Sequence, residues 1–201
     1  MADEAPPLAG LAGRAYYLRP LTVSDYEPLR FMELAEDAIH VYRHRSVTPS
    51  PDDFVRSQWA DVLVNFAVCR RDTDELVGNV VCYRADHQAG HAWLSAFVTE
   101  KHRGAASFEV LSLFVEYLFS SFRFRKLYAD IVAPNLDHMP SFPDYLFNRE
   151  AAFVDDVWIQ GRYHDRYVFA LWRDRWIELM GQDQQRMGAQ LAADLISGER
   201  V

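Results

Sequence analysis

Residues 91–133 read HAWLSAFVTEKHRGAASFEVLSLFVEYLFSSFRFRKLYADIVA and contain three structural signals in succession. The apolar segment 91–98 is typical of a β-strand, with Trp93, Ser95 and Phe97 on one face. Apolar residues at helical spacing then predict an amphipathic helix over 108–122. The segment 126–133 is again rich in strand-forming residues and stops at a proline. Strand, loop, helix and strand form a βαβ unit, so we expect the two strands to be parallel.

The flanking sequence predicts further strands and helices. We expect strands at 15–21, 64–69 and 76–83, a helix capped by Ser24 or Asp25, a second helix capped by Ser50 or Asp52 that runs through Trp59 and Val62, a short or broken helix within 136–152, an antiparallel pair at 153–159 and 166–172, and a last helix at 183–196. Together these elements predict an α+β (mixed α/β) fold, with a mixed, mostly antiparallel sheet of six or seven strands flanked by helices. The expected organisation is a flexible tail at 1–13, one domain at 14–178 and a C-terminal helix at 179–201.

Composition excludes several classes of protein. The 201 residues carry a formal net charge of −8, which argues against a nucleic-acid partner because phosphate binding needs a clustered positive surface. No apolar run approaches the roughly 20 residues of a membrane span, and the acidic N-terminus is unlike a signal peptide. We therefore expect a cytoplasmic protein that does not enter a membrane.

The histidines and cysteines give no metal signature. Two pairs, His40 with His44 and His87 with His91, have a spacing of four, but neither has the adjacent glutamate of a zinc hydrolase. Two cysteines are too few for a disulfide framework or a four-thiolate zinc site. We expect no metal cofactor.

The loop between the strand at 91–98 and the helix favours an anion site. Arg103 and Gly104 are followed by Ala105, Ala106 and Ser107. Backbone N–H groups at a helix start lack intrahelical partners and lie at the positive end of the helix dipole, so they can hold a phosphate. Arg103 could add a charge-assisted contact. The alternative is a plain turn whose small residues serve tight packing.

Several segments together carry a family resemblance. They are RPLT at 19–22, LVGN at 76–79, residues 98–109, EYLF at 116–119, KLYAD at 126–130 with Asn135, GRYHD at 161–165 and LWRDRW at 171–176. Their order resembles the GNAT superfamily of acyl-CoA-dependent N-acyltransferases, and among its branches the one that includes the ribosomal-protein alanine N-acetyltransferases. The resemblance covers about residues 15–176.

The sequence departs from the family pattern at two places. The family loop runs Arg-Gly-x-Gly-x-Gly or Ala, whereas Gly104 is followed here by Ala105, Ala106 and Ser107, and the loop is one residue shorter. Each missing glycine removes room for the backbone to approach a pyrophosphate. Asn148 stands where the family has a proton-donating tyrosine, and Tyr145 lies nearby.

The resemblance implies a site between two splayed strands, one ending near Val98 and the other near Asn135. Acetyl-CoA or another acyl-CoA would dock there, with the backbone of Phe97 and Val98 on the pantetheine amides and Arg103 through Ser107 on the pyrophosphate. An amine would then attack the thioester carbonyl directly. The enzyme must remove a proton from the ammonium and return one to the thiolate.

Candidates for these proton transfers are few. Glu33, His91 and Asp130 are candidates for proton removal, and Tyr145 is the candidate for thiolate protonation. In the alternative interpretation, Glu33 and Asp130 are solvated charges and His91 is a strand-edge residue.

Two functions stay open at this stage. The first is an acyltransferase that acts on an amine of a small molecule or a peptide, where the acidic surface favours a cationic acceptor. The second is a catalytically silent relative that binds a ligand or partner and does not use acyl-CoA. The aromatic-rich face could fill the core, line an acceptor pocket or form a homodimer contact.

Overall fold

The computed structural model describes residues 11–35, 43–102, 105–137 and 147–181. Its elements are β1 (Tyr16–Pro20), η1 (Val23–Asp25), α1 (Tyr26–Glu33), α2 (Pro51–Ser57), β2 (Val62–Arg70), β3 (Leu76–Asp86), β4 (His91–Val98), η2 (Glu100–His102), α3 (Ala105–Ser121), β5 (Lys126–Val132), α4 (Ala133–Asp137), β6 (Asn148–Ile159) and β7 (Arg162–Trp172). A further helical stretch covers 173–181.

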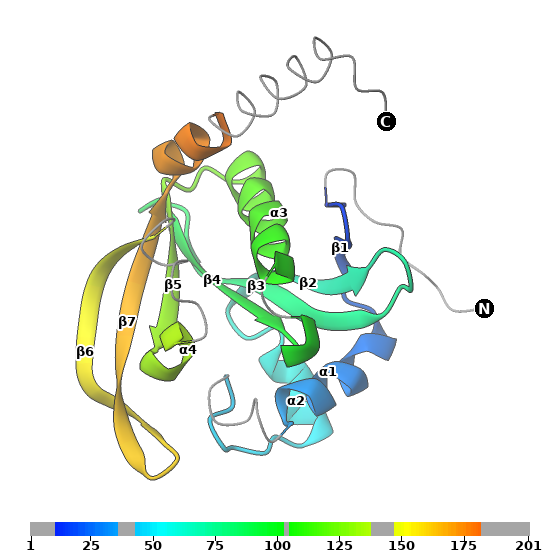
Figure 1. Ribbon diagram of the computed structural model, residues 1–201. Helices are drawn as coiled ribbons and strands as arrows, with labels where there is room; N and C mark the ends of the chain where they lie inside the picture. The colour runs from blue at the N-terminus through cyan, green and yellow to red at the C-terminus, as the bar shows by residue number, and fades with distance from the viewer. Residues whose placement is uncertain (1–10, 36–42, 103–104, 138–146, 182–201) are drawn as a thin grey trace, which may run out of the picture.

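The strands form one seven-stranded sheet in the order β1-β2-β3-β4-β5-β7-β6. β4 and β5 are parallel, as the βαβ pattern predicted, and the other neighbouring pairs are antiparallel. The predicted fold class is therefore confirmed. Helix α3 connects the two parallel strands, and it lies on one side of the sheet, with α1 and α2 on the other (Figure 1).

The main core lies between α3 and the sheet. Val110, Phe114 and Leu118 of α3 are completely buried, and they share one apolar cluster with residues of β1 to β5 and β7. Their spacing of four residues puts the three side chains on one stripe of the helix, which is the stripe that the sequence pattern predicted.

The RPLT motif at 19–22 stabilises the turn that leads from β1 to α1. Arg19 at the end of β1 donates two hydrogen bonds, of 2.7 and 2.8 Å, to the carboxylate of Asp25. The same carboxylate accepts from the backbone N–H (2.7 Å) and the hydroxyl (2.9 Å) of Thr22. Although burial alone would raise the pKa of Asp25, these hydrogen bonds from Arg19 and Thr22 lower it. The motif thus holds the turn between β1 and α1.

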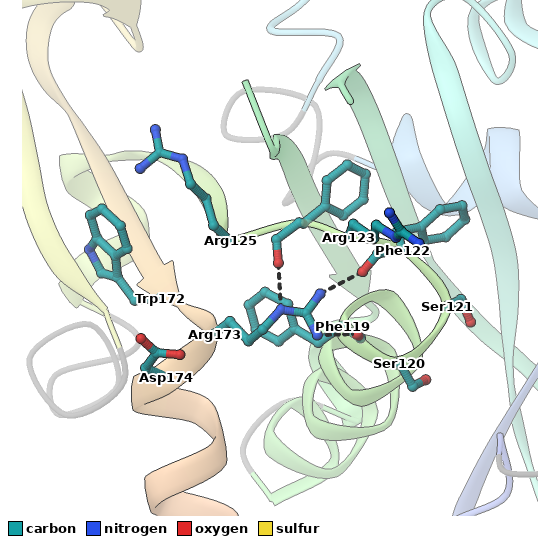
Figure 2. A pocket seen from close by; sticks show the side chains of 10 residues that line it. Phe119, Ser120, Ser121, Phe122, Arg123, Arg125, Trp172, Arg173 and Asp174 are labelled. Carbon is teal, nitrogen blue, oxygen red and sulfur yellow. Dashed lines mark hydrogen bonds between the residues drawn. The ribbon is translucent and has the colours of Figure 1, made fainter. Parts of the chain in front are cut away.

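The LWRDRW segment at 171–176 stabilises the carboxyl end of α3. Arg173 donates hydrogen bonds to the backbone carbonyls of Phe119 (2.5 Å), Phe122 (2.5 Å) and Phe124 (2.7 Å), where α3 ends (Figure 2). The last carbonyls of a helix lack intrahelical partners and lie at the negative end of its dipole. A guanidinium there supplies hydrogen-bond donors to these carbonyls and a positive charge that offsets the dipole. Trp176 adds a hydrogen bond from Nε1 to Glu116 (2.7 Å).

Some predicted boundaries differ from the observed ones. The second helix ends at Ser57 instead of continuing to Val62, because the chain turns through Asp61, whose φ is +56°, into β2. The strands predicted at 153–159 and 166–172 begin earlier, at Asn148 and Arg162. β6 lies at the sheet edge and is exposed over most of its length, so its first residues show no burial pattern.

The two chain ends also depart from the prediction. Residues 11–13, assigned to a flexible tail, fold back on β1, and Leu11 is 1% exposed. A helical stretch at 173–181 follows β7 directly, so helix begins before residue 179, where the C-terminal helix was expected to start. The helix predicted at 183–196 lies outside the described residues.

Candidate acyl-transfer site

The two parallel strands separate along their length. Their register runs from His91 opposite Lys126 to Leu94 opposite Ala129 and then stops. Beyond this point β4 stays paired with β3 as far as Val98, and β5 stays paired with β7. Among the described residues, the inner edges of the two strands do not pair with each other beyond this point, and Figure 1 shows the strands diverging. An extended ligand that carries amides can pair with such an edge.

Gly78 sets the position of the diverging part of β4. A Cβ atom at this glycine would lie 2.0 Å from the backbone oxygen of Phe97. Gly78 pairs with Val98, and the N–H of Thr99 continues the contact through a 2.9 Å hydrogen bond to Val77. β4 can thus approach β3 closely at its carboxyl end only because residue 78 has no side chain.

The loop after β4 is tied to β1. The N–H of His102 donates to Thr99 (2.9 Å), and its buried ring contacts Tyr16, with 3.3 Å between Nδ1 and the tyrosine oxygen. Arg103 and Gly104 lie outside the described residues. Helix α3 begins at Ala105, so its N-terminus follows the diverging end of β4, as the anion-site prediction requires.

The other predicted CoA contacts lie around this point. Phe97 and Val98 are buried at the end of β4, Ala105 and Ala106 open α3, Ser107 is half-buried in its first turn, and Asn135 is half-buried in α4, which follows β5. Phe108 is 42% exposed, so its ring is not enclosed in the core between the strands. The fold brings these segments to the same end of the parallel pair.

Asp130 lies at the point where the strands separate. It follows Ala129, the last residue of β5 that pairs with β4. One carboxylate oxygen accepts from Arg166 at 3.0 Å, and Arg166 also donates to Asp156 at 2.6 Å. The other oxygen, Oδ1, is buried and has no hydrogen-bond partner among the described residues. Arg166 lowers the pKa of Asp156 through this hydrogen bond, and Arg45 contributes through its charge.

Glu33 is enclosed on the α1 and α2 side of the sheet. It has no exposed surface, and its Oε2 lies 2.7 Å from Nε2 of His44. Gln58 donates to Oε1 at 3.4 Å, and Arg43 approaches Oε2 at 4.0 Å. The solvated-charge alternative for Glu33 is therefore wrong, because its side chain has no exposed surface and its carboxylate is bound by protein side chains.

Sequence reasoning missed the polar residues that surround Glu33. His44 had been considered only as a metal ligand, and Gln58, Asn65 and Asn79 had been given no functional role. The sequence did contain a signal: β2 and β3 are otherwise apolar at their centres, and each has one asparagine there. A buried amide needs polar partners, so these asparagines indicated a buried polar cluster.

The remaining two candidates are elsewhere. His91 is the first residue of β4, at the paired end and away from the point of separation, and its ring lies 5.4 Å from that of Tyr128. Tyr145 lies outside the described residues. Asn148 is the first residue of β6.

Other features of the described residues lie apart from this site. A pocket of about 560 Å³ opens at the far end of α3, lined by Phe119 through Arg125 and 172–174 (Figure 2). The guanidinium of Arg173 there is already bonded to three carbonyls. Within the part of the chain that the structure describes, no three His, Cys, Asp or Glu side chains are grouped as metal ligands. No helix in the described ranges is long and apolar enough to span a membrane.

Comparison with known proteins agrees with the arrangement. A family model described as an acetyltransferase (GNAT) domain matches residues 16–139. No curated protein sequence matches the chain. The chain is similar to the solved structure of spermidine N-acetyltransferase from Vibrio cholerae in complex with CoA and spermine, with a TM-score of 0.70 at 16% identity, over 81% of this chain and 98% of that one. It is also similar to a GNAT-family acetyltransferase from Bacillus anthracis, with a TM-score of 0.66 at 15% identity, over 82% and 98% of the two chains.

Proposed function

Since the chain belongs to the GNAT acetyltransferase family, we propose that it transfers an acetyl or longer acyl group from CoA to an amine. The observation that carries the proposal is the separation of β4 and β5 after Leu94 and Ala129, directly before the N-terminus of α3. This places strand-edge amides that lie beyond the β4–β5 pairing next to a helix start, and acyl-CoA needs both: amide pairing for its pantetheine arm and N–H donors for its pyrophosphate.

The residues of the site fit acyl-CoA as the donor substrate. The backbone from Ser95 to Val98 pairs with the pantetheine amides. The helix start at Ala105 to Ser107, with Arg103 and Gly104, binds the pyrophosphate, and Asn135 borders the opposite strand. Alanines in place of the family glycines leave less room for the pyrophosphate at this loop, so the main-chain amides and Arg103 supply most of the affinity for acyl-CoA. The bound thioester supplies an activated carbonyl.

Asp130 holds the acceptor. One oxygen of its carboxylate accepts from Arg166, and its buried Oδ1 still lacks a hydrogen-bond donor among the described residues. A ligand ammonium at the point of strand separation would supply that donor and offset the cost of the unpaired oxygen. Asp130 therefore serves as an anchor for a cationic amine.

Direct attack on the thioester requires two proton transfers. The ammonium loses a proton to become nucleophilic, and the CoA thiolate gains one as it leaves. We assign the second transfer to Tyr145, because Asn148 at the family tyrosine position cannot donate a proton of suitable acidity. A Tyr145→Phe variant should lower kcat and leave acetyl-CoA binding unchanged.

The family resemblance and the similar solved structures suggest two classes of acceptor. The resemblance to ribosomal-protein N-acetyltransferases favours an amine at a peptide N-terminus. The Vibrio cholerae structure contains spermine, a small polyamine. Acetyl transfer to spermine and to a peptide with N-terminal alanine, measured side by side, separates the two.

Thermal unfolding with acetyl-CoA tests the proposal. A ligand at 100 times its Kd stabilises the folded state by about 2.7 kcal/mol, so saturating acetyl-CoA should raise the Tm by several degrees. Arg103→Ala should reduce this shift. Arg123→Ala, at the opposite end of α3, is the matched control and should retain it. No stabilisation of the wild type by acetyl-CoA would instead support the silent ligand-binding or partner-binding protein.

A further inference from the structure

A chain of buried polar side chains connects the sheet to the segment after α1. It starts at Asn79, which lies opposite Phe97 of β4. Asn79 donates to Asn65 (3.2 Å) and to Gln58 (3.3 Å). Gln58 in turn donates to Glu33, whose carboxylate contacts His44. The network thus runs from the strand beside the acyl-CoA edge of β4 to an imidazole.

His44 is held in a defined orientation at the end of this chain. Its Nε2 lies 2.7 Å from Oε2 of Glu33, and its ring lies 5.7 Å from that of Phe54 in α2. A buried carboxylate favours the tautomer whose proton is on Nε2, which leaves the lone pair on Nδ1. Nδ1 makes no hydrogen bond to a described residue, and the His44 side chain keeps 7% of its surface exposed.

The segment that carries His44 lies near the acceptor anchor. Arg45, the next residue, is close enough to Asp156 for its charge to act on that carboxylate. Asp156 shares Arg166 with Asp130. Arg45 therefore lies close enough to the ion pairs of Asp130, Asp156 and Arg166 for its charge to act on them.

The other candidates suit proton removal less well. Asp130 is already engaged in an ion pair with Arg166, and Glu33 has no exposed surface through which a substrate could reach it. General-base catalysis works best with a group that titrates near the working pH, and imidazole is such a group. The titratable or charged groups that face His44 are Glu33 of α1 and the neighbouring Arg43. Among the described residues, Phe54 of α2 packs near its ring, and Gln58, the residue after α2, hydrogen-bonds to Glu33.

We propose that His44 is the base that deprotonates the acceptor amine and that Glu33 is its positioning residue; this rests on the proposed function. Nδ1 of His44 takes one proton from the ammonium, directly or through one water. The nitrogen lone pair that is released forms the C–N bond at the thioester carbonyl, and the C–S bond then breaks with its electron pair on sulfur. The thiolate takes up one proton as it leaves, and the new amide nitrogen loses one.

Kinetics of His44→Gln test the proposal, with spermine or the alanyl peptide as acceptor, whichever turns over faster. We expect kcat at pH 7 to fall about 100-fold, with an unchanged KM for acetyl-CoA. The pH profile of kcat should differ between the wild type and the variant, because the variant has no ionisable ring at this position. Added imidazole should restore part of the activity of His44→Ala. His87→Gln, whose ring stacks on Phe124 away from the site, is the control and should behave as wild type.

Histidine NMR gives a readout that needs no acceptor. The neutral His44 ring should be protonated on Nε2 in the wild type, and Glu33→Gln should disturb this tautomer while acetyl-CoA still raises the Tm. A His44 protonated on Nδ1, or a His44→Gln variant with the wild-type kcat and pH profile, would overturn the proposal and leave the acyltransferase function standing. Absence of acetyl-CoA binding by the wild type would overturn both.

Discussion

At the scale of single residues, Gly78 is the position where one added atom should matter most. Its missing Cβ leaves room for the backbone of Phe97. Gly78→Ala forces β3 and β4 apart, so we expect the free energy of unfolding in urea to fall by about 2 kcal/mol. Stabilisation by acetyl-CoA should fall as well, because β4 moves. Gly181→Ala, where nothing lies within 4 Å of the new atom, is the control, and equal effects of the two substitutions would contradict the close contact.

Asp25 gives a second residue-level prediction. Asp25→Asn leaves the buried Arg19 without its charge partner, which should cost about 3 kcal/mol of unfolding free energy at pH 7. Because the pKa of Asp25 is lowered in the folded protein, its stabilisation is complete above its unfolded pKa, about 4, and is lost as the pH falls through the folded value.

Urea unfolding of both proteins at several pH values measures this dependence. The difference between wild type and Asp25→Asn should shrink below about pH 4. Asp53→Asn, which removes a carboxylate from an exposed pair with Arg56, is the control and should change stability far less than Asp25→Asn. A difference that stays constant from pH 7 to pH 3 would contradict the assigned role of Asp25.

The residues of the candidate site could be predicted only in part from the sequence. Asp130 and Glu33 could be selected as ionisable groups in plausible segments, but their partners could not. Arg166 reaches Asp130 from a strand 36 positions later, and His44 reaches Glu33 across a loop. Such contacts depend on how elements pack, and a single sequence contains no direct record of them.

At the scale of elements, Arg173 supports the end of α3. Arg173→Ala removes three hydrogen bonds to carbonyls of Phe119, Phe122 and Phe124. We expect a loss of about 2 kcal/mol in unfolding free energy, because a charged donor at a helix end is worth more than a neutral one. Arg175→Ala breaks only an exposed pair with Glu178 and should cost under about 1 kcal/mol. Similar losses in the two variants would contradict the capping role.

The elements themselves were largely predictable. β4, α3 and β5 follow the periodicity of their residues because each has one face against a single large core. β6 was predicted too short because an exposed edge strand has no apolar face to mark its start. The helix at 133–137 includes Pro134 in its first turn, where proline is tolerated, so a residue that indicated the end of a strand also begins a helix.

At the scale of the whole molecule, the candidate site is assembled from distant parts of the chain. β4 and β5 supply the unpaired edges, α3 the helix start, and the segment after α1 the imidazole. The βαβ pattern predicted that β4 and β5 are neighbours. It could not predict that their pairing ends after four residues, because that depends on how β3 and β7 hold the two strands from outside.

Hydrogen–deuterium exchange with and without acetyl-CoA tests the central claim most directly, because it reports which backbone amides the donor substrate covers. The account predicts slower exchange at 95–98, the part of β4 beyond its pairing with β5, and at 105–108, the first turn of α3. It predicts no change around the pocket at 119–125 and 172–174. Protection at that pocket instead, or no protection anywhere at saturating acetyl-CoA, would contradict it.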